Sequence, residues 1–198
     1  IKGGLPIFTG EYKDKVKSML PEMGLEFRMP LAYITNWFQL NLGLEAMFYG
    51  VKSKAMEVSM PWLGTGDLNN VYKMYHIPVI ANLFLRFKPL KWLDISLIFG
   101  FGISINKLEA LQARADSTPL WEDKTKISYI LKTGIDLQFR FSRVISLDIQ
   151  FTFMHFGKPD FYTEEFTGTD IWVANIYDSL VQGSYNIFSL TAGIAIAF

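Results

Sequence analysis

Tyr185–Phe198 reads YNIFSLTAGIAIAF and alternates strictly between two kinds of side chain. Bulky apolar residues hold every second position from Phe188 to Phe198 (apart from Ala192), and small or weakly polar residues lie between them. This period of two predicts a β-strand, because successive side chains of a strand point to opposite faces. Neither face carries a charge, and only one is bulky. Such a strand suits the wall of a closed barrel, where its edges are paired and its bulky face meets lipid.

The composition is apolar but offers no membrane-spanning helix. Half of the 198 residues are hydrophobic and 16% are aromatic, both high for a water-soluble domain. No apolar run reaches the roughly 18 residues that a transmembrane helix needs. We therefore expect one domain over residues 1–198, with either a large β core or a lipid-facing barrel.

Charge and cysteine content exclude several functions. The formal net charge is zero, so no basic excess suggests a nucleic-acid partner. The chain has no cysteine, which excludes disulfides, thiolate metal sites and cysteine nucleophiles. No signal peptide is visible in the sequence, and we expect a mature or trimmed chain from which an export signal has been removed.

Alternation recurs along the chain, and the connections between the alternating segments follow a pattern. We predict eight strands, at residues 3–8, 23–29, 38–48, 72–87, 93–105, 127–141, 147–153 and 185–198. The connections are long, short, long, short, long, short and long. In an antiparallel up-and-down barrel this places all short turns at one end, as in transmembrane β-barrels of the outer membrane.

The positions of the charges distinguish a membrane barrel from a soluble one. A lipocalin-like barrel holds its large apolar residues inside, whereas a membrane barrel turns them outward. From the second segment on, the bulky face carries no charge between the loops. The other face carries charged residues along its length: Glu26, Arg28, Glu45, Arg86, Asp94, Lys132, Asp136, Arg140 and Asp148. We therefore predict an all-β, eight-stranded transmembrane barrel with these charges in its lumen.

The short connections suggest how some of these charges pair. A hairpin symmetric about Leu90 puts Arg86 opposite Asp94, and one symmetric about Val144 puts Arg140 opposite Asp148. The second register also puts Gln138 opposite Gln150 and Phe139 opposite Ile149. Together with Glu26 and Arg28, these pairs predict an ionic plug in a lumen only wide enough for side chains.

The residues Thr191, Gly193, Ile196 and Phe198 resemble the C-terminal β-signal of bacterial outer-membrane barrels. The whole pattern resembles the small eight-stranded OmpA/OmpX-like barrel family, and Ile77–Phe87 is similar to a strand of such barrels from Bacteroidota. The resemblance implies a bacterial outer-membrane location and insertion by the barrel-assembly machinery. It also implies a surrounding bilayer with lipopolysaccharide.

No residue pattern predicts a catalytic, cofactor or metal site, and we expect no enzyme. His155 resembles in placement the histidine of barrel lipid A deacylases, but Gly157 stands where those enzymes have serine. The acidic segment after Lys158 lacks EF-hand spacing, so a solvated loop is expected there.

Three roles remain: a structural or partner-binding barrel, an accessory subunit of a larger assembly, and a small porin. Aromatic residues of the long loops favour a protein partner: Trp62, Trp121, Phe161, Phe166 and Trp172.

Overall fold

The computed structural model describes residues 1–9, 16–53, 73–109, 111–112, 119–121, 124–159 and 184–197. The regular elements in these ranges are strands: β1 (Lys2–Thr9), β2 (Val16–Met19), β3 (Glu22–Tyr33), β4 (Phe38–Ser53), β5 (Lys73–Leu90), β6 (Leu93–Leu108), β7 (Leu111–Gln112), β8 (Pro119–Trp121), β9 (Lys124–Arg140), β10 (Ile145–Phe156) and β11 (Tyr185–Ile196). Within them, no helix has the length and apolar character to cross a membrane.

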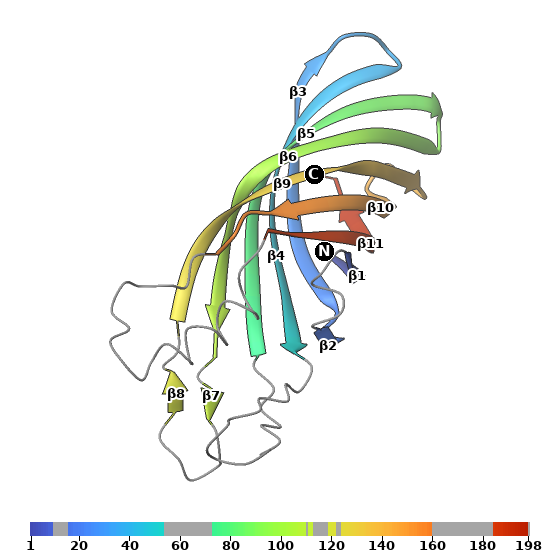
Figure 1. Cartoon of the computed structure of the whole chain (residues 1–198). Helices are drawn as coiled ribbons and strands as arrows, with labels where there is room; N and C mark the ends of the chain where they lie inside the picture. The colour runs from blue at the N-terminus through green and yellow to red at the C-terminus, as the bar shows by residue number, and fades with distance from the viewer. Residues whose placement is uncertain are drawn as a thin grey trace, which may run out of the picture.

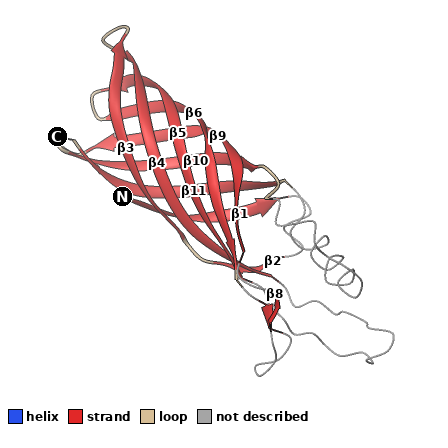
Figure 2. Cartoon of the chain, turned by 90° about the vertical axis from the view of Figure 1, so that its left-hand side faces the viewer, coloured by secondary structure: helices blue, strands red, loops and turns tan. Residues whose placement is uncertain are grey.

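The long strands form a closed antiparallel ring (Figures 1 and 2). Each pairs with its neighbours in the chain, and β4 pairs with β5 across the second long connection. The first and last strands close the ring, with Lys2 opposite Gly193 and Thr9 opposite Asn186. Because β2 and β3 both pair with β4, together they act as one strand of the ring. The predicted all-β barrel of eight antiparallel strands is confirmed.

Two prolines shape the first hairpin. The expected loop over residues 9–21 contains β2, which continues β3 beyond Pro21. Pro21 has no N–H, and the backbone N–H of Leu20 instead donates to the Gly50 carbonyl at 2.8 Å. Pro6 lies inside β1, opposite Ser189. The described pairing of β1 with β3 stops at Gly4, since Pro6 cannot donate to that side.

The two faces of the wall differ as predicted. Large apolar side chains are exposed on the outer face of every long strand, including Leu5, Phe27, Leu44, Ile77, Phe99, Ile135, Phe151 and Leu190. Among the described residues, charged side chains on this face lie only at the long-loop end, at Lys52, Lys73, Lys107 and Glu109. The inner face is buried and largely polar along the half of the barrel near the short turns.

The predicted hairpin registers are wrong by two residues. Arg140 lies opposite Ser146 and not Asp148, because the turn closes early: the Ser142 hydroxyl accepts the backbone N–H groups of Val144 and Ile145 at 3.1 and 2.9 Å. Phe139 consequently faces Leu147 rather than Ile149, and Gln138 faces Asp148 rather than Gln150. Arg86 lies opposite Ser96 rather than Asp94, because an irregularity between Phe87 and Leu90 shifts that hairpin. A second small difference is the β7–β8 hairpin, which lies within a predicted loop.

Candidate functional site: the ion-paired lumen

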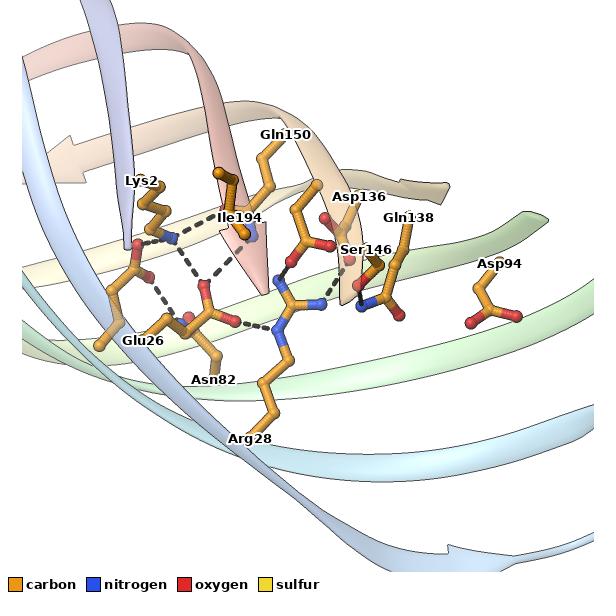
Figure 3. Close-up of polar contacts among 12 residues, drawn as sticks. Lys2, Glu26, Arg28, Asn82, Asp94, Asp136, Gln138, Ser146, Gln150 and Ile194 are labelled. Carbon is orange, nitrogen blue, oxygen red and sulfur yellow. Dashed lines mark hydrogen bonds and ion pairs between the residues drawn. The ribbon is translucent and has the colours of Figure 1, made fainter. Parts of the chain in front are cut away.

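A guanidinium from β3 reaches across the lumen to two strands that are not its neighbours. Arg28 donates from Nη1 to Asp136 Oδ2 at 2.6 Å and lies 3.2 Å from Asp148 Oδ2 through Nη2. Its Nε contacts Glu26, two residues back on the same strand. Figure 3 shows this guanidinium among carboxylates from opposite walls. Such contacts hold the two sides of the barrel together, and each guanidinium nitrogen is matched to a carboxylate.

A second set of contacts surrounds Glu45, whose side chain is 0% exposed. Its carboxylate contacts the ammonium groups of Lys2 and, at 2.6 Å, Lys132, and it accepts from Asn82 Nδ2 at 2.7 Å. Lys2 also lies 2.6 Å from Glu26, which joins this set to Arg28. We refer to these ion-paired residues together as the central cluster: Lys2, Glu26, Arg28, Glu45, Lys132, Asp136 and Asp148.

Glycines make room for the central cluster in the narrow lumen. A Cβ at Gly193 would lie 2.5 Å from the Ile1 carbonyl oxygen and 2.7 Å from Lys2 Cβ. A Cβ at Gly43 would lie 2.7 Å from the ring of Phe84, over which the Arg28 guanidinium stacks at 4.3 Å. Gly193 of the predicted assembly signal thus has a packing reason of its own, independent of any recognition during insertion.

A smaller set of charges, which we call the mouth cluster, lies by the short turns and contains Arg86, Asp94 and Arg140. Asp94 Oδ2 accepts from Arg86 Nε at 2.9 Å and from Arg140 Nε at 2.8 Å. The predicted pair between Arg140 and Asp148 is therefore wrong, since Arg140 contacts Asp94 and Asp148 contacts Arg28. Gln138 links the cluster to β10 by donating to Ser146 at 2.7 Å.

Towards the long loops, the lumen contains stacked rings in place of charges. His76 is fully buried, with its Nδ1 2.6 Å from Asn106 Oδ1 and 2.8 Å from the Tyr185 hydroxyl. Tyr49 stacks on His76 with ring centroids 4.8 Å apart, and Phe156 stacks on Tyr185 at 4.6 Å. The strand parity of Tyr49 places its side chain inside the lumen.

His155 lies on the outer wall. Its Nδ1 is 2.7 Å from Asn186 Oδ1, and its Nε2 faces the Tyr129 hydroxyl at 3.4 Å. A Cβ at Gly157 would lie 2.4 Å from the Tyr129 ring, so the serine of the deacylase pattern would require this exposed ring to move. Among the described residues no group of three metal-ligating side chains occurs.

The remaining predicted residues fall in different places. Thr191 is buried on the inner face, and Ile196 is exposed on the outer face. Phe198 lies outside the described residues, as do the loop residues Trp62, Phe161, Phe166 and Trp172. Trp121 is described only through its backbone, in β8.

Sequence reasoning missed two charged residues of the lumen, Lys2 and Glu22. Both are buried, and the Ser189 hydroxyl donates to Glu22. Extending the alternation of their strands by one or two residues would have assigned both to the inner face.

Comparison with known proteins gives remote structural likenesses. The crystal structure of Neisserial surface protein A matches with 13% identity and a TM-score of 0.47, over 100% of this chain and 94% of that chain. The structure of Ail, the attachment invasion locus protein of Yersinia pestis, in complex with the heparin analogue sucrose octasulfate, matches with 11% identity and a TM-score of 0.36, over 98% of this chain and 97% of that chain. No family model matches, and no curated protein matches. At these identities the likenesses say nothing about what the chain binds or does.

Proposed function

We propose that this chain is an integral protein of a bacterial outer membrane, with its long loops outside the cell and its short turns in the periplasm. The observation that carries the proposal is the outer face of the barrel. Its large apolar side chains are exposed on every long strand, while the charges of the same strands, apart from those at the long-loop end, lie on the inner face. In water this arrangement would expose apolar surface and bury charge, both unfavourable; in a bilayer the apolar face is covered by lipid.

We further propose that the lumen is a plug and not a pore. Ion pairs of the central cluster cross the lumen from β3 to β9 and β10, and stacked rings fill it nearer the long loops. The small-porin alternative requires a continuous water path past both layers. Single-channel recording in planar bilayers separates the two: the plug predicts no stable conductance for the wild-type chain, and a large, stable unitary conductance would establish the pore.

The role of the barrel is proposed to be structural or partner-binding, without catalysis. Its partners are then the bilayer, lipopolysaccharide and, during insertion, the barrel-assembly machinery that would read Thr191, Gly193, Ile196 and Phe198. A protein partner would bind through the long loops or, for an accessory subunit of a larger assembly, through the barrel wall. Cross-linking in native membranes followed by affinity capture distinguishes these. A Bacteroidota source, suggested by Ile77–Phe87, is part of the same proposal.

Membrane fractionation with gel migration tests the location. The chain should stay with the outer membrane after carbonate washing, require detergent for extraction, and migrate differently with and without boiling, because a closed barrel resists unfolding in dodecyl sulfate. Wild-type chain that stays in aqueous solution without detergent would refute the proposal.

A further inference from the structure

The short-turn end of the lumen carries a local excess of positive charge. Asp94 Oδ2 accepts from the Nε groups of both Arg86 and Arg140, so one carboxylate serves two guanidiniums. Lys88 follows Arg86 by two residues on β5, nearer the short turn, and is partly exposed. This end of the lumen therefore holds three cations and one carboxylate. The central cluster shows the opposite balance, with three cations and four carboxylates.

Arg140 is the most accessible of these paired lumen cations. Its side chain is 35% exposed, and that of Arg86 is 19% exposed. In the central cluster, the side chains of Arg28, Lys2 and Lys132 are 19%, 7% and 2% exposed. Lys88 is half-buried, with its Nζ 5.8 Å from the centre of the Tyr33 ring. An anion could therefore reach the three cations from solution without displacing any side chain of the central cluster.

The turns around this opening add to the same charge. The charged residues of the short connections beyond Lys88 are Lys91 and Arg143; both are basic and both are exposed. Cations grouped at a partly desolvated opening repel one another and attract anions over roughly a Debye length, about 8–10 Å at physiological salt. A bound oxyanion would relieve this repulsion.

We propose that the short-turn mouth of the barrel, lined by Arg86, Lys88 and Arg140, is a binding site for a single oxyanion, a carboxylate or a phosphate. Guanidinium groups match both chemistries, since their N–H donors fit paired oxygen atoms. The ligand is a soluble molecule that approaches along the barrel axis, because the three cations lie around the lumen opening and not on the lipid-facing wall. The site is distinct from the long loops and from the barrel wall.

Nuclear magnetic resonance of the arginine side chains tests this proposal. The full chain, purified in an uncharged maltoside detergent, is titrated with inorganic phosphate and, separately, with N-acetylglutamate, while the Nε–H signals of Arg86 and Arg140 are followed. Saturable shifts of both signals are expected, weaker at high salt. A shift with only one anion identifies which oxyanion is the ligand. Because the barrel is tested in detergent, the outcome does not depend on its cellular location.

Two substitutions at the mouth are expected to change anion binding in opposite directions. Arg140→Gln leaves Arg86 paired with Asp94 and should weaken binding about tenfold or more, as expected for loss of a charged donor. Asp94→Asn removes the competing carboxylate and should tighten binding. Lys52→Gln, at the opposite end of the barrel, is the matched control and should change nothing.

Several results would overturn the proposal. No saturable shift with either anion in wild type at low salt is one, and equal affinities for wild type, Arg140→Gln and Lys88→Gln are another. If Asp94→Asn does not fold, the arginine and lysine variants still test the proposal. Shifts that appear only in nanodiscs containing phosphatidylglycerol, and not with soluble anions, would assign the mouth to a lipid headgroup and refute a soluble ligand.

Discussion

The outer and inner faces of the same strands reverse the arrangement of a water-soluble barrel. On β5, Leu83 and Ile77 point outward, while the neighbouring positions Asn82 and His76 are fully buried in the lumen. A lipocalin-like barrel of the same size would hold the leucine inside and the polar residues in water. Alternation therefore defines the two faces of a strand, and the positions of the charged residues indicate which face meets the surroundings.

The inner face itself is not uniform. Glu45 and Asp136 of the central cluster are fully buried, and each faces cations from other strands. The mouth cluster lies closer to solvent, so water screens its charges. Substitutions should therefore cost most in the central cluster, less on the lipid-facing wall and least at the mouth.

The largest effect is expected from Glu45→Gln. This change leaves Lys132 without its carboxylate, whereas Lys2 keeps Glu26 at 2.6 Å. A buried ion that loses its partner costs about 3–5 kcal/mol. The free energy of unfolding, measured by urea titration of barrels refolded into lipid vesicles, should fall by that amount.

A second substitution sharpens this test. Lys132→Met removes the stranded ammonium, so the double variant Glu45→Gln/Lys132→Met should be more stable than Glu45→Gln alone. If the free energy of unfolding of the double variant falls by the sum of the two single effects, Glu45 and Lys132 are not coupled.

An intermediate effect is expected on the outer wall. Leu83→Arg places a charge near the bilayer midplane and should cost about 2–4 kcal/mol in the same vesicle assay. Ile149→Arg, on the outer face of β10, should behave alike. Leu83→Phe keeps an apolar side chain and serves as the control. If Leu83→Arg lowers the free energy of unfolding no more than Leu83→Phe does, this face meets water, and the proposed difference between the two faces is wrong.

The smallest effect is expected at the mouth. Arg140→Ala should cost about 1 kcal/mol, because the guanidinium is partly solvated and Asp94 keeps Arg86. A double-mutant cycle should show coupling between Arg140 and Asp94. The cycle between Arg140 and Asp148 should show additivity, and coupling there would restore the hairpin register inferred from the sequence.

Strand number, strand faces and the order of long and short connections could be predicted because each depends on local alternation and on chain length between segments. The mutual pairing of the charges could not. The 139–147 hairpin is centred on Arg143, one residue before the assumed centre at Val144, and Arg140 contacts Asp94 in place of Asp148. The bonds from Arg28 to Asp136 and Asp148 join strands that are not neighbours, so they depend on how the closed ring is staggered.

Site-directed spin labelling measures the orientation of the wall most directly, and the chain contains no cysteine to interfere. A nitroxide on Leu83→Cys, in barrels reconstituted in liposomes, is compared by power saturation with one on Lys91→Cys in a short turn. The inverted wall predicts that the label at residue 83 collides strongly with oxygen and hardly with a water-soluble nickel chelate, and that the label at residue 91 behaves in the opposite way. A label at residue 83 that collides freely with the nickel chelate would contradict the account.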